Sequence, residues 1–328
     1  MISAEAATSQ IPVLIIGGGP TGLNLALQLG ARSVPCILVN DGQTTPSHPQ
    51  GSSHKARTME HYQRLGVARQ VRATGLPPDQ PTDAAYVTRV AGHEITRFPM
   101  PSSDDKMRLG SPERALTPEP LHRGSQMYVE AVLKQHLDTV ASVYVRFGWR
   151  LTAFWPHPDH VIAELLDLAS GTRERVKCGY LVGCDGGQSM VRQRLGIRYE
   201  GETGHEVGYM MGRMMSVYFQ ARAFHSLTRS KPVWQWQVFN ARRRHSMMEL
   251  DGKGKILALF KLEPEIDVHG YDPRPAIRAA IGADIPVTLH SPKPWTAGLS
   301  LVSESYQDGR GLMRAIPYTC SPRPEGWG

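Results

Sequence analysis

A short glycine-rich segment near the start of the chain carries the clearest chemical signal. Val13–Ile16 is an apolar run suited to a buried strand, and it leads into GGGPTG at Gly17–Gly22. In such a turn Gly17 permits the tight bend, Gly19 lets a pyrophosphate approach the backbone, and Gly22 permits close helix–strand packing. An amphipathic helix pattern follows, so the free N–H groups at its positive end face the phosphate. The residues predicted to bind a dinucleotide here are Gly17, Gly19, Pro20, Thr21 and Gly22.

The next predicted strand ends in polar side chains where a ribose contact is expected. Cys36–Val39 is this strand, and Asn40 and Asp41 follow it. Dinucleotide-binding folds place an acidic residue at this point, where its carboxylate binds ribose hydroxyl groups. Here the expected position holds the amide of Asn40, whose neutral hydrogen bond is weaker than a charged one, and the carboxylate comes one residue later. We predict that Asn40 and Asp41 contact the cofactor.

A second turn with an acidic residue, far downstream, argues against a plain nicotinamide dehydrogenase. Leu181–Arg192 reads LVGCDGGQSMVR, an apolar strand pattern that breaks at Asp185 and Gly186 before a short helix. A plain nicotinamide dehydrogenase has no reason to repeat such a unit. Asp185 could alternatively cap the following helix, since aspartate is a favoured N-terminal cap. Its order after the glycine-rich turn favours cofactor contact.

At this point the chain resembles the class A flavoprotein aromatic hydroxylases, of the para-hydroxybenzoate and phenol hydroxylase type. These proteins combine an N-terminal GxGxxG with a later DGxxSxxR element. The resemblance continues through His54–Val67, Ser125–Leu137 and Trp295–Arg310. In the second of these segments, the resemblance implies that Gln126 touches the cofactor.

The resemblance implies an FAD-dependent monooxygenase that uses NAD(P)H and O2 to hydroxylate a phenolic or polyketide-type aromatic. The flavin does the oxygen chemistry in such enzymes, so no side chain is needed as a nucleophile. We therefore name no catalytic residue. Two alternatives stay open: an NAD(P)-dependent reductase or flavin oxidase, and a non-catalytic remnant.

Composition excludes several other classes of protein. The 328 residues are 41% hydrophobic and 20% charged, which is typical of a folded soluble protein. The net charge of +7 is spread along the chain, so we do not predict nucleic-acid binding. No apolar run approaches the ~18 residues of a membrane span, and the four cysteines and thirteen histidines show no metal-ligand spacing. We predict a cytoplasmic protein with a small aromatic substrate and no metal, and leave homodimer formation open.

The element pattern predicts an α/β protein with a Rossmann-like FAD-binding domain and an inserted, mainly antiparallel β-sheet substrate domain. Strand, glycine turn and helix begin the first domain, and longer alternating strands between 201 and 295 indicate the second. The predicted division is a tail at 1–10, an incomplete FAD-binding domain at 11–75, 110–200 and 296–310, a substrate domain at 76–109 and 201–295, and an aberrant tail at 311–328.

Two tryptophans in the predicted substrate domain are candidates for substrate contact. In the strand pattern Val233–Phe239, a period of two puts Trp234 and Trp236 on one face. That face either forms an aromatic wall for a planar substrate or packs into the core of its own domain, and core packing is the commoner case.

The match to the family stops after Arg310. Relatives continue with an apolar strand, a Gly-Asp-Ala motif and a helix, whereas this chain continues with GLMRAIPYTCSPRPEGWG. Arg314, Pro317, Pro322 and Pro324 oppose a buried strand, and no Asp follows Asp308. We therefore expect a truncated form with impaired FAD binding and activity.

Overall fold

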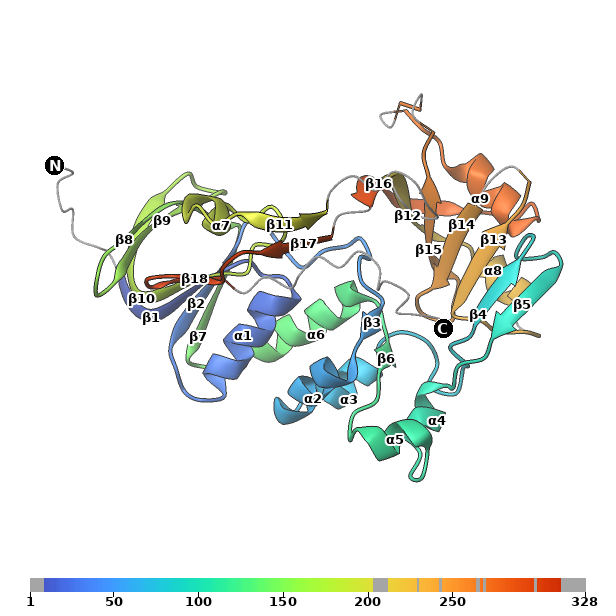
Figure 1. The fold of residues 1–328 in the computed structure, drawn as a ribbon, viewed down its shortest axis with the longest axis horizontal. Coiled ribbons are helices and arrows are strands. Elements are labelled where there is room, and N and C mark those ends of the chain that lie inside the picture. The colour runs from blue at the N-terminus through green and yellow to red at the C-terminus, as the bar shows by residue number, and fades with distance from the viewer. Residues whose placement is uncertain are drawn as a thin grey trace. The chain divides into compact units, whose positions relative to one another are not determined.

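The chain folds into two compact units in the computed structural model (Figure 1). The residues described are 9–202, 212–228, 230–241, 244–263, 266–267, 270–297 and 300–313. Among them, the first unit takes in 9–47, 129–202 and 300–313, and the second takes in 48–128 and the described part of 212–297.

A largely parallel sheet forms the centre of the first unit. Its strands lie in the order β18-β19-β10-β1-β2-β7, and β9 pairs with β10 and β8 in antiparallel fashion. The parallel pairs β1–β10, β1–β2, β2–β7 and β10–β19 bring several carboxyl strand ends to one edge. The strands are β1 (Ser9–Ile16), β2 (Cys36–Asn40), β7 (Val143–Phe147), β8 (Trp149–Pro156), β9 (Val161–Asp167), β10 (Arg173–Gly183), β18 (Gln307–Asp308) and β19 (Gly311–Met313). A separate antiparallel pair joins β11 (Tyr199–Glu202) to β17 (Ser300–Ser303).

The helices of the first unit follow the predicted apolar spacing. In α1 (Pro20–Gly30), Leu23, Ala26 and Leu27 are buried. The other helices are α7 (Met190–Arg194) and most of α6 (Gln126–Leu137), whose first residues belong to the second unit. No helix in the described part of the chain is both long and apolar enough to cross a membrane.

The predicted aberrant tail begins with regular structure. Gly311–Met313 forms β19, which pairs in parallel with Leu181–Gly183 of β10. The three residues before Arg314 thus pair with β10, whose edge offers backbone groups for them, and whether the tail is aberrant stays a prediction. Residues 314–328, including Arg314 and the three prolines, lie outside the described residues.

The second unit is built on a mainly antiparallel sheet, as predicted. Its strands lie in the order β16-β12-β15-β14-β13-β4-β5, and only β13 and β4 pair in parallel. The strands are β4 (Ala84–Val87), β5 (Glu94–Phe98), β12 (Gly212–Gln220), β13 (Gln235–Phe239), β14 (Arg244–Glu249), β15 (Lys255–Lys261) and β16 (Thr288–Ala297). Helices α8 (Arg222–Thr228) and α9 (Arg274–Ile281) bury apolar side chains against one face of this sheet, including Phe224, Ile277 and Ile281.

Shorter elements of the second unit include the pair β3 (Ser53–His54) and β6 (His122–Arg123). The helices here are α2 (Ala56–Arg64), α3 (Ala68–Arg72), α4 (Ser103–Met107) and α5 (Pro112–Leu116). Leu76 and Met127 share an apolar cluster with Met248 of β14, on the other face of the sheet. Segments 48–75 and 110–128, which the sequence analysis assigns to the FAD-binding domain, thus pack within the second unit. The functional domain boundaries stay a prediction.

Candidate functional site

Two glycines of the glycine-rich turn are required by the packing of the protein itself. Gly17 has a φ of +112°, a conformation that L side chains rarely adopt. A Cβ atom on Gly17 would lie 2.3 Å from the carbonyl oxygen of Cys184, and one on Gly22 would lie 1.9 Å from the carbonyl oxygen of Gly17. These contacts join the ends of β1 and β10 to the first turn of α1. A glycine at these two positions is therefore explained without a ligand.

Gly19 differs from these two glycines. Its backbone is extended, with φ −77° and ψ −176°, and a Cβ atom there would meet nothing within 4 Å. Neither strain nor packing within the described protein requires glycine at this position. The open space lies at the N-terminus of α1, which has Pro20 in its first turn, no acidic residue there and no side-chain cap. A helix end of this kind attracts an anion, so the residues fit the pyrophosphate of a dinucleotide.

Asn40 is held by the glycine-rich turn. Its Oδ1 atom accepts a hydrogen bond of 2.9 Å from the N–H of Gly18. The side chain therefore shapes the turn, a role that the sequence analysis did not predict. Asp41 is 62% exposed, and its carboxylate lies 3.6 Å from Arg150. Ribose binding by Asn40 or Asp41 stays a prediction.

Asp185 follows β10, next to the end of β1. Its two carboxylate oxygens accept hydrogen bonds from Ser189 Oγ at 2.5 Å and from the N–H of Val191 at 3.2 Å. The N-cap of α7 is Ser189, and Asp185 supports this helix start through its bonds to Ser189 and to the Val191 N–H. A carboxylate has about four acceptor sites, so these bonds leave room for a further donor. Cofactor contact by Asp185 stays a prediction.

Gln126 lies in the second unit, at the start of α6. Its Oε1 atom accepts a hydrogen bond of 3.3 Å from the N–H of Gly51, and its backbone N–H donates to the carbonyl of Gly51 at 2.7 Å. Gln126 thus fixes the loop before β3, and its predicted cofactor contact is untested.

The two tryptophans have different surroundings, contrary to the predicted shared face. Trp236 packs in the core against Phe224, with ring centroids 5.0 Å apart. Trp234 comes before the first residue of β13, so the alternation of the strand does not govern it. It belongs to the apolar cluster on the opposite face of the sheet, and the Arg123 guanidinium stacks 4.0 Å from its ring centroid. Trp234 alone remains a candidate for substrate contact.

A small polar recess adjoins Trp234. Arg123, Ser125 and Glu249 line it, together with Trp234. Glu249 is 2% exposed, and Gln80 donates a hydrogen bond of 3.3 Å to its Oε2 atom. Burial raises the pKa of Glu249 to about 7. The sequence analysis missed this group because its members come from segments far apart in the chain.

The chain is similar in sequence to known monooxygenases. FAD-dependent monooxygenase apdD of Emericella nidulans is 29% identical over 232 residues, which cover 70% of this chain and 36% of that protein. Tetracenomycin A2 monooxygenase-dioxygenase of Streptomyces glaucescens is 28% identical and covers 94% of this chain and 57% of its own length. The chain thus spans about a third to somewhat over half of these relatives.

Solved structures of flavoproteins share the fold. The flavin-dependent monooxygenase PieE, in complex with FAD and substrate, matches with a TM-score of 0.82 and 26% identity over 94% of this chain and 53% of its own. The rebeccamycin biosynthetic enzyme RebC with reduced flavin matches with a TM-score of 0.81 and 31% identity. The match covers 94% of this chain and 56% of the RebC chain. The sequence pattern of the FAD binding domain matches residues 10–282. The chain therefore belongs to the FAD binding domain family of flavoproteins.

Proposed function

We propose that the protein is an FAD-dependent monooxygenase that hydroxylates a phenolic or polyketide-type aromatic with NAD(P)H and O2. The observation that carries the proposal is the open space at Gly19, beside the uncapped N-terminus of α1. The pyrophosphate of FAD fits this position in charge and in the room it needs. FAD, when bound, supplies the redox and oxygen chemistry.

The residues of the chain then have binding and positioning roles. The backbone N–H groups of Thr21 and Gly22 would bind the phosphates of FAD, and Asn40 holds the turn in place through Gly18. We assign further cofactor contacts to Asp41, Gln126 and Asp185. None of these side chains needs to form a covalent bond with the substrate.

We assign the aromatic substrate to the second unit. Trp234 is 7% exposed and lies next to the polar side chains of Arg123 and Glu249, and the Arg123 guanidinium stacks on its ring. A polycyclic phenol combines the two kinds of contact that these groups offer, ring stacking and hydrogen bonding. Relatives named Tetracenomycin A2 monooxygenase-dioxygenase, Aklavinone 12-hydroxylase and Putative polyketide hydroxylase support the assignment of a polyketide-type aromatic.

The test has a binding step and a turnover step. Purified protein is titrated with FAD and NAD in competition, and then supplied with NADPH, O2 and a panel of polycyclic phenols. We expect preferential FAD binding and a product that carries one oxygen atom from 18O2. Tighter binding of NAD than FAD would instead favour the reductase alternative, and substrate-independent oxidation of NADPH without an oxygenated product would favour the flavin oxidase.

We also place the protein in the cytoplasm. Cys36 and Cys178 are buried thiols that form no disulfide in the described part of the chain, which suits a reducing compartment. Homodimer formation stays a prediction that sedimentation of the purified chain would test.

A further inference from the structure

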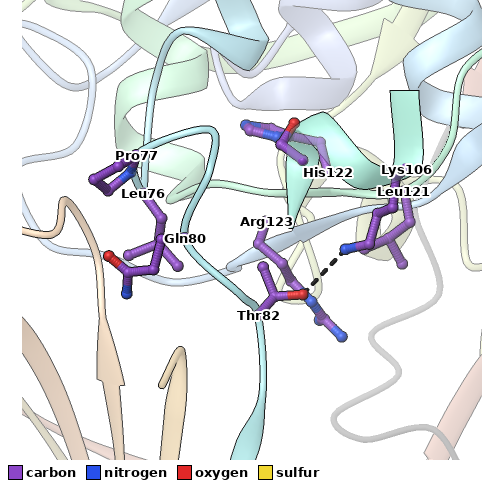
Figure 2. A pocket seen from close by; sticks show the side chains of 9 residues that line it. Leu76, Pro77, Gln80, Thr82, Lys106, Leu121, His122 and Arg123 are labelled. Atoms are coloured by element: carbon purple, nitrogen blue, oxygen red, sulfur yellow. Dashed lines mark hydrogen bonds between the residues drawn. The ribbon is translucent and has the colours of Figure 1, made fainter. Parts of the chain in front are cut away.

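Two cationic side chains line one recess in the second unit. Lys106 comes from α4 and Arg123 from β6, and Thr82 and His122 contribute to the same recess (Figure 2). Lys106 is only 7% exposed. Its Nζ atom donates a hydrogen bond of 3.1 Å to Thr82 Oγ1, and this leaves two of its three N–H groups for other acceptors.

Neither cation has a carboxylate partner among the described residues. Arg123 donates to Ser53 Oγ and stacks on Trp234. Its Nε atom is inaccessible to solvent and makes no hydrogen bond in the described structure. Lysine and arginine are almost never buried without a pairing group, because an isolated buried charge is costly.

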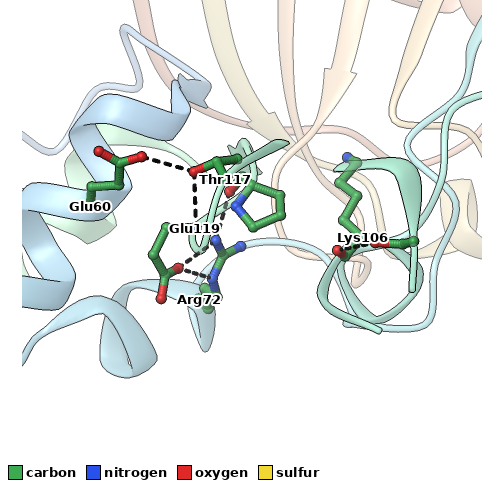
Figure 3. A network of polar contacts seen from close by, with 7 residues as sticks. Glu60, Arg72, Lys106, Thr117 and Glu119 are labelled. Atoms are coloured by element: carbon green, nitrogen blue, oxygen red, sulfur yellow. Dashed lines mark hydrogen bonds and ion pairs between the residues drawn. The ribbon is translucent and has the colours of Figure 1, made fainter. Parts of the chain in front are cut away.

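A neighbouring arginine shows the usual arrangement. Arg72 donates to Glu119 Oε2 from Nη2 at 2.7 Å and from Nε at 3.0 Å, and it also donates to the carbonyl of Pro120 (Figure 3). The side chains of both Arg72 and Glu119 are largely buried. Arg72 therefore has a buried carboxylate partner, Glu119, which is paired with Arg72 rather than with Lys106 or Arg123.

The pKa of Lys106 reflects this excess of positive charge without a paired carboxylate. Its pKa is lowered to about 8 by burial and by repulsion from Arg123 and Arg72, against which Glu113 acts in the opposite direction. His122 beside it adds no further positive charge at neutral pH, because burial lowers its pKa to about 3. An anion in the recess would relieve this repulsion.

The size of the recess limits what can bind. It leaves room for about one water molecule, far too little for an aromatic ring or a nucleotide phosphate. We infer that the recess beside Lys106 and Arg123 binds a small inorganic anion of chloride size. Such an ion links α4 to β6 and neutralises charge next to the guanidinium that stacks on Trp234. The inference does not depend on FAD binding or on hydroxylation.

Chloride titration followed by thermal unfolding tests the inference. Sodium chloride replaces sodium gluconate at constant ionic strength, because gluconate is too large to enter. For the unmodified chain we expect a saturable rise in Tm of about 2 °C or more. Lys106→Met should abolish the rise. The control Lys134→Met, which removes an ammonium on α6 that pairs with Asp138, should retain it. Because each variant is compared with itself in two salts, a change in its basal stability does not affect the result.

A crystal of the unmodified chain grown in sodium bromide gives a direct check. An anomalous difference peak within hydrogen-bonding distance of Lys106 Nζ, beside the Arg123 side chain, supports the site. The inference is overturned if the recess holds water alone and the Tm is insensitive to chloride, or if Lys106→Met responds as the unmodified chain does.

Discussion

The glycine-rich turn of the first unit and the polar recesses of the second differ in how their residues are brought together. Gly17–Gly22 is one continuous segment, and the close contacts of Gly17 and Gly22 are with backbone atoms of Cys184 and Gly17. Lys106, Arg123 and Glu249 instead come from α4, β6 and β14. A site built from backbone conformation leaves a pattern in the sequence, whereas a site built from distant side chains leaves none.

This difference explains which predictions succeeded. The strand, turn and helix around Gly19 could be predicted because glycine, proline and apolar spacing each act locally. The antiparallel character of the second sheet followed from alternation in its strands. Trp234 was misplaced because the strand begins one residue later, at Gln235. The bond from Gly18 to Asn40 could not be predicted, because the local sequence does not show which way an amide side chain points.

The largest expected effect is on the free energy of unfolding, and it distinguishes Gly22 from Gly19. Gly22→Ala puts a methyl group 1.9 Å from the Gly17 carbonyl oxygen, between backbone segments that cannot easily move. We expect a loss of ~4 kcal/mol or more in the free energy of unfolding. Gly19→Ala should change it by less than ~1 kcal/mol. Urea unfolding followed by circular dichroism measures both, and equal stability of the two variants would contradict the structure.

Acid should weaken the second unit through its buried histidines. Burial lowers the pKa of His54 to about 4 and that of His122 to about 3. The unfolded chain therefore takes up protons first, so stability is lost as pH falls below about 6.5, by ~2 kcal/mol for each histidine at pH 5. Unfolding free energies at pH 7, 6 and 5 test this, and His54→Asn should show a shallower loss. An identical pH dependence in that variant would rule out the contribution of His54.

Glu249 should act in the opposite direction. Its pKa is raised from 4.5 to about 7, so the unfolded chain loses this proton first, and stability falls as pH rises from about 4.5 to about 7 and then levels off. We expect ~1 kcal/mol less stability at pH 9 than at pH 6 from this group. Glu249→Gln keeps an acceptor for Gln80 but does not titrate, so it should remove this loss. If the variant and the unmodified chain lose the same amount, Glu249 is not the group responsible.

The smallest expected effect concerns the support of the glycine-rich turn. Asn40→Leu removes the acceptor for the Gly18 N–H and should cost ~1 kcal/mol in unfolding free energy. Asn40→Asp keeps an oxygen in the same place and should stay within ~0.5 kcal/mol of the unmodified chain. Thermal unfolding of the two variants in parallel distinguishes a specific hydrogen bond from a general tolerance of substitution.

The most direct test of the central claim compares the FAD affinity of two variants, each with valine in place of a glycine that packing within the protein does not require. Gly19 and Gly270 both have an ordinary φ and open space where a Cβ atom would lie, so valine should be accommodated at either. We predict that Gly19→Val weakens FAD binding by ~100-fold, about 3 kcal/mol, with little change in Tm, because the side chain occupies the place of the pyrophosphate. Gly270→Val should bind FAD as the unmodified chain does. Equal FAD affinity in all three proteins, measured by fluorescence titration, would contradict the assignment of Gly19 to the cofactor site.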